Sequence, residues 1–562
     1  MKKASARTIG KVALRVFIAV LLPLLVYYVY LPPMNPASRD FWLFLVFVCL
    51  VVGFALRIYD FRSLFRVEQT EKGTELKLGD RKKFFRKGRV SHVFTWVTLL
   101  LLAVIPIGSL ISSPVFHAAG YAGVITVKDE DFMTDMPETD QISNIALMDT
   151  DSARILGSRQ LGELAGVVSQ YVVSENYTQI NYQGHPMKVA NLEYDGFIKW
   201  FTNRKEGIPG YIMVDAVGNT ASYKELSEGM QYAESAYFGK DLSRALRFAY
   251  PTKIFDNISF EVDETGKAYY IVSCASPRVD LFGAMDISEV IIFDPVSGSG
   301  TLYPLSEVPS WVDIVFDGYL ACEKYDWYGT LSGGFINSVI GNKGCKETTA
   351  DFGYLMLEDD VWYFTGVTSV TADASNIGFI LSCARTGEYK FYPVIGAEEY
   401  SAMGAAEGEV QEKGYEASFP ALINIAGEPT YIMVLKDQNG LVKLYALVNV
   451  EQYSMVATGE TQAEAKAAYL KLLAQSGVDI SDSDSTLEKT VVIQEKQYAQ
   501  MAGATYVYLT DEDGAVFRIE FNEKNETVIF LAVGDTVVLR YTEDATTGIY
   551  RVSEFVLPEK GE

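Results

Sequence analysis

Three long apolar runs near the N-terminus constrain this chain more than any other feature. They are VALRVFIAVLLPLLVYYVYL (12–31), FWLFLVFVCLVVGFAL (41–56) and VFTWVTLLLLAVIPIGSLI (93–111). Because about 20 helical residues cross the hydrocarbon core of a bilayer, each run is close to spanning length. Basic residues precede the first run as in a signal peptide, but no small-residue cleavage site follows, which favours a retained segment. The sequence therefore predicts a three-helix membrane anchor over residues 1–113.

The distribution of basic residues predicts how this anchor is oriented. The segment 57–92 holds eleven Lys and Arg, whereas the connection between the first two runs holds only Arg39. The positive-inside rule places the N-terminus and the 57–92 loop in the cytoplasm and residues 114–562 outside it. Lying between two spans, the basic loop is more typical of contact with anionic lipid than with nucleic acid. We expect a multi-pass cell-membrane protein that has membrane lipid as a partner and binds no nucleic acid.

The remainder of the chain has the composition of folded, acidic domains. The net charge of the 562 residues is −24, yet the first 113 residues carry 17 Lys and Arg against 6 Asp and Glu, so the rest carries −35. A hydrophobic fraction of 49% is ample for burial. Helical and strand-like patterns alternate here, which predicts an α+β fold with mostly antiparallel exterior sheets and short helices. The predicted parts are an acidic connector (114–151), an α+β domain (152–256), a β-rich hairpin region ending in a helix (257–479) and a small β-barrel (487–562).

One strand–turn–strand phrase occurs four times in the exterior part. An apolar run meets an acidic residue and a glycine turn and is followed by a second run, which is typical of antiparallel hairpins on half-buried sheets. The four copies are GIPGYIMVDAVGNTASYKEL (207–226), EVIIFDPVSGSGTLYPL (289–305), GFILSCARTGEYKFYPV (378–394) and PTYIMVLKDQNGLVKLYALV (429–448).

These phrases resemble the hairpins of PepSY-type domains, in which a helix packs on an antiparallel sheet. Over about 150–475, the runs at 393–420 and 429–461 are similar to those of uncharacterised membrane-anchored envelope proteins of Gram-positive, clostridia-type bacteria. The resemblance implies a location in the cell envelope and no particular activity.

The last part of the chain shows about five strand-like segments over 488–557, after the polar run ISDSDST (480–486). Among them, the glycine-marked strand GDTVVLRY (534–541) resembles a strand of a small closed barrel such as the OB fold. We expect an OB-like barrel at the C-terminus. Before this polar run, Thr461 and Glu464 have the spacing of a helix capping box.

Residues for common catalytic mechanisms are scarce. The chain has three histidines, and only His185 falls within the exterior domains. It contains no GxSxG, HExxH, CxxC or GxxxxGK[ST] motif. The sequence therefore predicts a protein that is not an enzyme and has no cofactor and no metal site, with His185 as a loop histidine.

Aromatic and acidic residues gather in three stretches, SEVPSWVDIVFD (306–317), CEKYDWYGTLSGGF (322–335) and LEDDVWYFTG (357–366). Such mixtures line sugar-binding grooves. The alternative is that the acids, including Glu358 and Asp359, lie in solvent at turns while the aromatic rings enter the sheets. The candidate binding residues are Trp311, Asp313, Asp326, Trp327, Tyr328, Asp360 and Trp362.

Four cysteines fall on the predicted exterior, an even number. The short loop between Cys322 and Cys345 favours a bridge between them, and Cys274 with Cys383 is the second candidate pair. The alternative is four buried thiols.

Together, these features predict a membrane-anchored extracytoplasmic binding or scaffold protein of the cell envelope. Its partner would be a cell-wall component, a peptide or another membrane protein. Two alternatives remain open. One is a carboxylate-dependent hydrolase acting on envelope polymers, and the other is a sensor or accessory subunit of a membrane complex.

Overall fold

A computed structural model describes residues 17–57, 65–70, 73–78, 89–139, 145, 147–357, 359–476, 478, 487–501, 504–521, 525–543 and 549–556. The chain divides into two compact units. Unit 1 comprises Met1–Pro137 and Gln141–Tyr469, and unit 2 comprises Glu138–Asp140 and Leu470–Glu562.

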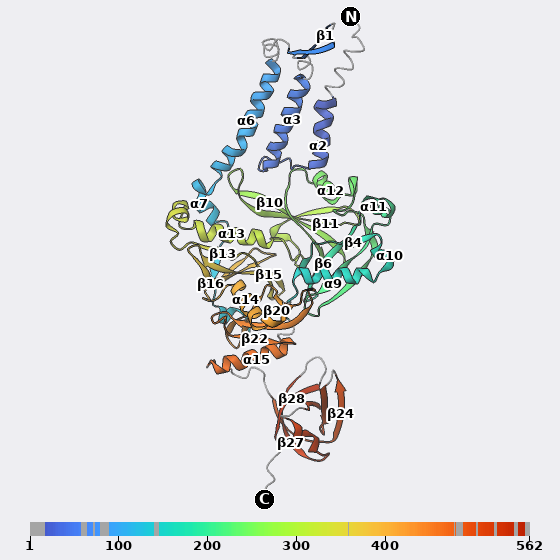
Figure 1. Cartoon of the computed structure of the whole chain (residues 1–562), viewed down its shortest axis with the longest axis vertical. Helices are drawn as coiled ribbons and strands as arrows, with labels where there is room; N and C mark the ends of the chain where they lie inside the picture. Colours follow the sequence, from blue (N-terminus) through green and yellow to red (C-terminus); the bar gives the residue numbers. More distant parts are fainter. Residues whose placement is uncertain are drawn as a thin grey trace. The chain divides into compact units, whose positions relative to one another are not determined.

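The N-terminal part of unit 1 is helical (Figure 1). It contains η1 (Phe17–Leu21) continuing into α2 (Leu22–Tyr30), then α3 (Arg39–Arg57) and α6 (Arg89–Ile111). Among the described residues, one helical stretch, Val93–Ile111, is long and apolar enough to cross a membrane, and the apolar stretch Phe17–Tyr30 is shorter. The predicted third span at 93–111 thus coincides with a suitable helix, whereas the complete three-helix anchor does not follow from length and hydropathy alone.

The loop between α3 and α6 is described in part. It contains the antiparallel hairpin of β1 (Phe65–Thr70) and β2 (Gly73–Leu78). The sequence pattern did not single out these strands, because basic residues dominate the loop.

Hydrogen bonds fix the helices to the rest of unit 1. Ser112, just after α6, accepts bonds through its Oγ from the backbone nitrogens of Leu281 and Phe282 at 3.1 and 3.2 Å. On the other side, Arg247 Nε donates to the carbonyl of Leu31 at 2.9 Å. The residue after α2 and the residue after α6 are thus both bonded to the rest of unit 1.

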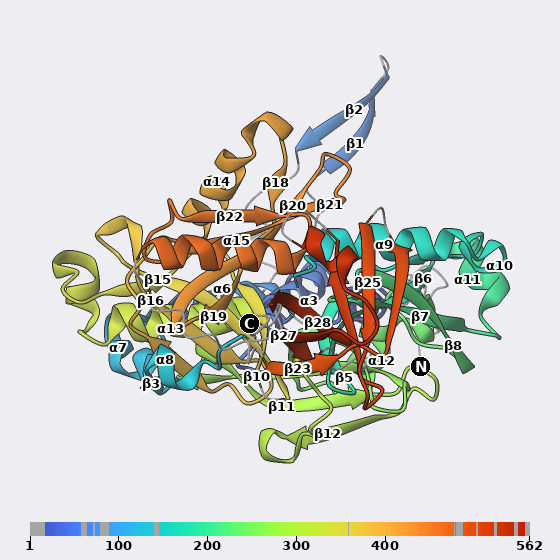
Figure 2. The ribbon, with the colours of Figure 1, turned by 90° about the horizontal axis from the view of Figure 1, so that it is seen from below.

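Four sheets build the remainder of unit 1, and all pairings within them are antiparallel except that of β17 with β3. Figures 1 and 2 show the β4–β8 sheet and the β13–β17 sheet on opposite sides, with the β9–β12 sheet between them. The first sheet has the order β4-β6-β7-β8, with β5 on β6, and the second has the order β12-β11-β10-β9. The third has the order β13-β15-β16-β17-β3, with β14 on β15, and the fourth has the order β18-β20-β21-β22, with β19 on β20.

The strands of these sheets are β3 (Val127–Asp129), β4 (Tyr171–Val173), β5 (Thr178–Tyr182), β6 (His185–Tyr194), β7 (Ile208–Asp215), β8 (Thr220–Met230), β9 (Ile254–Val262), β10 (Ala268–Val279), β11 (Gly283–Phe293), β12 (Gly300–Pro304), β13 (Lys346–Thr348), β14 (Gly353–Leu357), β15 (Asp360–Ser369), β16 (Ala372–Cys383), β17 (Tyr389–Tyr392), β18 (Glu416–Ala417), β19 (Ala421–Ile425), β20 (Glu428–Lys436), β21 (Val442–Asn449) and β22 (Val456–Gly459).

Short helices cover and connect the sheets. They are α7 (Pro114–Ala122), α8 (Phe132–Asp135), α9 (Thr150–Gly162), α10 (Ala165–Val168), α11 (Phe197–Asn203), η3 (Phe238–Lys240), α12 (Leu242–Ala249), η4 (Leu305–Glu307), α13 (Gly318–Leu331), η5 (Asn337–Gly341), α14 (Glu399–Glu409), η6 (Gln411–Lys413) and α15 (Gln462–Gln475). The predicted capping box opens α15, because Thr461 Oγ1 accepts from the Glu464 nitrogen at 3.1 Å.

The repeated phrase forms a hairpin in all four places: β7–β8, β11–β12, β16–β17 and β20–β21. In three of the turns, an aspartate carboxylate accepts the backbone N–H two residues further on; these are Asp215, Asp294 and Asp437, at 2.9, 2.8 and 2.9 Å. In the β16–β17 turn, Cys383 has the same place, and its Sγ accepts from the Thr386 nitrogen at 3.4 Å. In each copy, the side chain at the start of the turn accepts a backbone N–H of the same turn and so favours the hairpin locally. The same short pattern can therefore build a hairpin at four places in the chain.

The main hydrophobic core crosses the predicted boundary between 152–256 and 257–479. Ile212 and Leu192 of the first sheet pack in one cluster with Phe260 and Val272 of the second. Both predicted domains therefore belong to one unit, since hairpin sheets with one apolar face must bury that face against each other.

Unit 2 is a single curled sheet with the strand order β23-β27-β28-β26-β25-β24. β23 and β24 are separated by two residues, yet they lie at opposite edges of the sheet, so the sheet bends back on itself as a half-barrel. Its core contains Val507, Phe517 and Leu539. The elements are β23 (Leu487–Val492), β24 (Glu495–Met501), β25 (Ala504–Thr510), β26 (Val516–Glu520), η7 (Glu526–Phe530), β27 (Thr536–Glu543) and β28 (Ile549–Val556).

Candidate functional site

Two neighbouring cavities of unit 1 form a crevice between its sheets. The smaller cavity, of about 290 Å³, lies where β5 and β6 face β14 and the residues just before β19. The larger, of about 460 Å³, extends along β5 towards β9 and the start of α13. The two cavities share Thr150, Gln179, Tyr319, Phe352 and Tyr354. We call their combined lining the crevice.

Lys188 and Gln179 form a cross-strand pair in the smaller cavity. The β5–β6 register places them directly opposite each other, so their side chains leave the same face of the sheet. Lys188 is 2% exposed and Gln179 is 4% exposed. The Gln179 Nε2 has no hydrogen-bond partner, and the Lys188 Nζ lies 4.9 Å from the centre of the Tyr354 ring. Two buried donors are thus directed at a cavity lined by aromatic rings.

Asp149 is the acidic residue whose charge acts on Lys188, but it does not form an ion pair with that lysine. That carboxylate caps the N-terminus of α9, accepting from the Ser152 nitrogen at 2.8 Å, and it forms an ion pair with Lys436. Burial raises the pKa of Asp149, but the bonds from Lys436 and Ser152 outweigh burial and hold it below its ordinary value. Asp149 therefore remains ionised with its own cation.

Burial lowers the pKa of Lys188 from 10.5 to about 8, and the charge of Asp149 opposes this effect only in part. At neutral pH most molecules consequently hold a buried ammonium group. A buried ammonium and a buried amide donor are stabilised by a bound acceptor, and a carboxylate offers two acceptor oxygens. The rings of Tyr319, Phe352 and Phe419 supply apolar walls. Asp149 and Asp351 also line the smaller cavity, so the arrangement suits a carboxylate only at Lys188 and Gln179, joined to an apolar or aromatic body.

A second polar cluster lies behind the larger cavity. Glu261 Oε1 accepts from Ser259 Oγ at 2.9 Å and from the Ile314 nitrogen at 3.1 Å, and its Oε2 accepts from the Asp313 nitrogen at 2.8 Å. Asp313 Oδ2 accepts from the Asn181 nitrogen at 2.9 Å. Ser259 and Ile314 also line the larger cavity. The cluster therefore ties β9, the loop before α13 and β5 together at the crevice wall.

Glu261 and Asp313 are 0% and 3% exposed and titrate as an interacting pair. Burial raises the pKa of Asp313, and the charge of Glu261 raises it further. Burial also raises the pKa of Glu261, but three hydrogen bonds to its carboxylate oppose that rise. We therefore assign the negative charge to Glu261 and the proton to Asp313 at neutral pH. Since neither group lines the crevice, the pair has a structural role.

Three of the predicted binding residues lie in α13, and their side chains contact different neighbours. Asp326 Oδ1 accepts from the Thr348 nitrogen at 2.8 Å. The Trp327 ring lies 5.2 Å from the Tyr121 ring and lines a separate cavity near the start of α3. Tyr328 packs against the core of the β13–β17 sheet.

The other predicted binding residues are also dispersed. The Trp311 ring lies 5.1 Å from the Tyr269 ring, and Trp362 is buried in β15. Asp360 binds Arg385 through both carboxylate oxygens at 2.6 and 2.7 Å. Of the seven predicted residues, none lines the crevice. The structure places them in separate surroundings instead of one groove.

All five cysteines are free thiols in the structure, including the four of the two predicted disulfides. Cys345 Sγ contacts Asn337 Nδ2 at 3.4 Å, whereas burial raises the pKa of the Cys322 thiol to about 12. Cys383 closes a hairpin turn in the third sheet, and Cys274 lies in the second. The alternative of unbridged thiols agrees with the structure.

Among the residues that the structure describes, no three His, Cys, Asp or Glu side chains are grouped to hold a metal ion. His185, predicted to lie in a loop, is instead the first residue of β6, where it pairs with Tyr182 and is exposed, because the hairpin turn is only two residues long. Glu358 lies outside the described residues. No family model matches the chain, and no curated protein matches it in sequence. The crevice therefore has to be interpreted from its own chemistry.

Sequence reasoning missed Lys188 and Gln179, the residues that give the crevice its chemistry. Lys188 lies in the otherwise mostly apolar run MKVANL, which is the one local signal of a buried lysine. Gln179 has no comparable signal, since a glutamine in a short strand is ordinarily exposed.

Proposed function

We propose that this chain is a membrane-anchored, extracytoplasmic protein whose crevice binds a ligand with a carboxylate joined to an apolar or aromatic group. The observation that carries this proposal is the buried ammonium of Lys188, whose charge Asp149 offsets only in part, beside the unsatisfied amide nitrogen of Gln179. Leaving both donors buried is costly to the fold. A bound carboxylate would offset that cost, which is the usual property of a recognition site.

The proposed role is binding without catalysis. The carboxylates that sequence reasoning offered for a hydrolase have structural partners: Asp360 with Arg385, Asp326 with Thr348, and Asp313 in the buried pair. General acid–base catalysis needs a group within hydrogen-bond reach of a bound substrate. The partners of these three carboxylates support binding over hydrolysis.

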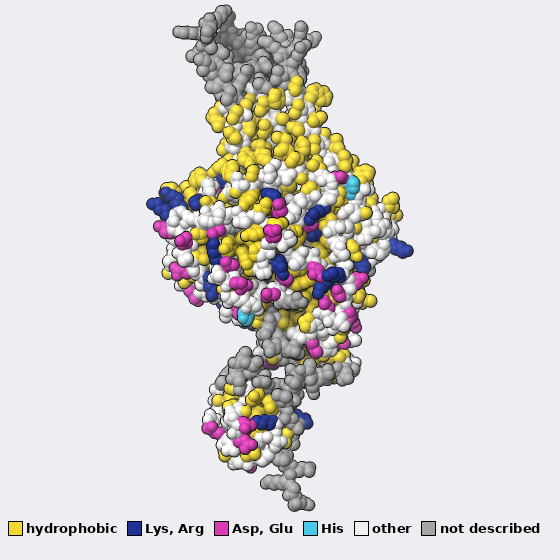
Figure 3. Space-filling view, turned by 180° about the vertical axis from the view of Figure 1, so that it is seen from behind, with side chains coloured by type: hydrophobic (Ala, Val, Ile, Leu, Met, Phe, Trp, Pro, Cys, Tyr) yellow, Lys and Arg dark blue, Asp and Glu magenta, His cyan; other side chains and the backbone are white. Residues whose placement is uncertain are grey.

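Membrane anchorage is supported by α6 and by the surfaces of the neighbouring helices. Figure 3 shows hydrophobic side chains covering the described part of the helices. α3 and α6 have 19 and 23 residues, and a helix rises about 1.5 Å per residue, so each reaches about 30 Å. We propose the three-span topology, with residues 57–92 inside and 114–562 outside, and an address in the cell envelope.

The strand order of unit 2 supports an OB-like barrel. β23 and β24 act as two halves of one bent strand that pairs with both β27 and β25, and β26 pairs with β28 in parallel. OB folds are partly open five-stranded barrels. An acidic barrel outside the cytoplasm would contact an envelope component and no nucleic acid.

Protease accessibility tests the topology. Protease added to intact wall-less cells is expected to degrade residues 114–562 and leave a protected fragment of about the first 113 residues, because the bilayer shields the spans and the cytoplasmic loop. Permeabilised cells serve as the control, in which the 57–92 loop is cleaved as well. Survival of the exterior part in intact cells would contradict this topology.

Binding of an aromatic carboxylate tests the crevice. Phenylacetate is expected to raise the midpoint of thermal unfolding of the full chain, because a ligand that binds only the folded state stabilises it. Phenylacetamide, the matched neutral compound, is expected to leave the midpoint unchanged, and Lys188→Met is expected to abolish the effect of phenylacetate. Equal shifts with both compounds, or an equal shift in the variant, would rule out recognition by Lys188.

A further inference from the structure

Exposed apolar side chains gather on unit 1 beside the base of the helices. The α11 wing consists of Phe197, Ile198 and Phe201 with Phe238 of η3. Ile198 is 73% exposed, and the rings form one patch in which Phe197 lies 6.1 Å from Phe201. The neighbouring helix α12 joins this wing to the bundle, since the Phe248 ring lies 6.1 Å from Tyr27 of α2.

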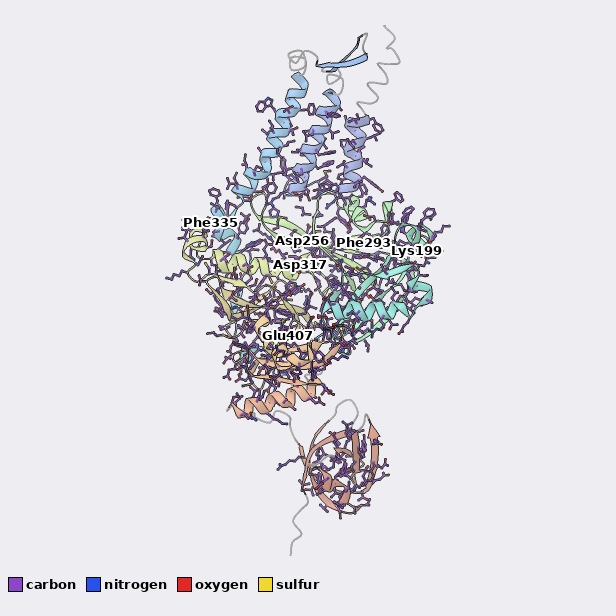
Figure 4. All side chains as sticks on the ribbon, viewed as in Figure 1. Lys199, Asp256, Phe293, Asp317, Phe335 and Glu407 are labelled. Carbon is purple, nitrogen blue, oxygen red and sulfur yellow. The ribbon has the colours of Figure 1, made fainter. Side chains whose placement is uncertain are left out.

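A second apolar patch, the η5 wing, lies on the other side of the base of the helices. It consists of Ile336, Val339 and Ile340, and Ile340 is 80% exposed. In Figure 4, Phe335 next to this wing and Lys199 of the α11 wing lie on opposite sides of the globular part. Both lie nearer to the helices than Glu407 does.

The wings differ in charge from the rest of the exterior. The segments 196–207, 235–253 and 332–346 together hold nine Lys and Arg and two Asp and Glu, whereas residues 114–562 as a whole hold 31 and 66. Of the nine, Arg247 is buried, and Arg244 and Lys253 form ion pairs with Asp241 and Glu289. Lys199 and Arg204 donate only to backbone carbonyls, of Ser169 and Phe201. Their charges are therefore not neutralised by these bonds. Apolar residues with basic neighbours are the combination that binds the interface of an anionic bilayer.

We propose that the globular part of unit 1 rests on the outer surface of the bilayer that its own helices enter, with the α11 and η5 wings in the headgroup region. This inference rests on the proposed membrane anchorage. Two wings on opposite sides of the bundle would hold the exterior part in one orientation. Tilting the exterior part towards one wing would pull the other wing out of the headgroup region. The crevice would then open at a fixed distance from the membrane.

Lipid-dependent quenching in nanodiscs tests this proposal. A fluorescent amino acid is introduced into the full chain at Ile198 or Ile340, in nanodiscs of phosphatidylcholine and phosphatidylglycerol with a quencher on the lipid headgroup. The expected quenching at both positions is several-fold greater than that at Tyr400, a control on α14 that is 46% exposed. Replacing Lys199 and Lys205 by Glu is expected to reduce the quenching at Ile198.

A probe at Trp96 of α6, combined with a quencher on the acyl chain, reports the anchorage separately. The wing proposal would be overturned, and the anchorage left intact, by one result. In that result the probe at Trp96 is quenched, but the quenching at Ile198 and at Ile340 is no greater than that at Tyr400. No quenching at Trp96 would overturn the anchorage and the wing proposal together. Quenching at only one wing would contradict the two-sided support.

Discussion

Replacing Lys188 by methionine is expected to make the protein more stable. In the wild type, burial lowers the pKa of this lysine from 10.5 to about 8, which corresponds to about 3 kcal/mol of destabilisation at neutral pH. Methionine has a similar length and no charge, so we expect a gain of about 1–3 kcal/mol in the free energy of unfolding. The midpoint of thermal unfolding measures this gain. A residue that lowers stability and directs a buried ammonium at a cavity is expected where function requires it.

The difference in stability between the wild type and Lys188→Met is expected to change with pH in a defined direction. The folded-state pKa of Lys188 lies below its unfolded value, so the charge is unfavourable in the fold at every pH below about 8. Between about 8 and about 10.5, the folded protein loses its proton first, and the wild type gains stability relative to Lys188→Met. Lys436→Met is the control, because it leaves Asp149 without its cation and is expected to destabilise. A less stable Lys188→Met variant would contradict this account of Lys188.

Replacing Glu261 by alanine is expected to have the largest destabilising effect. The carboxylate accepts hydrogen bonds from the backbone nitrogens of Asp313 and Ile314 and from the hydroxyl of Ser259. Each of the three buried donors left without an acceptor costs about 1–3 kcal/mol, so we expect a loss of at least about 3 kcal/mol. Glu261→Gln keeps one acceptor oxygen and is expected to lose less. Hydrogen exchange over residues 311–316 locates the effect, and unchanged protection there in the alanine variant would show that these bonds do not hold the loop.

In contrast to Glu261→Ala, Asp313→Asn is expected to make the protein less sensitive to alkaline pH. Burial and the charge of Glu261 raise the pKa of Asp313 above its unfolded value, so the wild type loses stability as pH rises from about 4 through that folded-state pKa. Asparagine resembles the neutral acid and cannot ionise. Thermal midpoints at about pH 6 and about pH 9 should therefore fall less in the variant than in the wild type. An equal fall in both proteins would show that Asp313 is not the protonated partner.

The hairpins could be predicted from the sequence because their signals are local. Each turn is closed by its own side chain, as with Asp215 and Asp294. The cross-strand pair in the crevice was predictable in principle. Gln183 and Gly184 have φ of 54° and 78°, as in a two-residue hairpin turn, and such a turn fixes the register that sets Gln179 opposite Lys188.

The rest of the site depends on contacts between distant parts of the chain. Glu261 and Asp313 come from different elements, and no local pattern predicts that a glutamate in β9 will accept the backbone of a loop 52 residues later. The state of the cysteines likewise could not be predicted from local sequence. An even number and a short loop suggested bridges, whereas the turn bond to Cys383 and the separate neighbours of Cys322 and Cys345 depend on the tertiary fold.

The most direct test of ligand recognition is the pKa of Lys188 itself, measured by nuclear magnetic resonance on the full chain with isotope-labelled lysine, with Lys188→Met used to assign the signal. We expect a pKa of about 8 in the free protein and a rise to about 10 or above with saturating phenylacetate, because a bound carboxylate favours the charged amine. Phenylacetamide should leave the value near 8. A pKa that is ordinary in the free protein, or that phenylacetate does not change, would contradict the proposal that this crevice recognises a carboxylate.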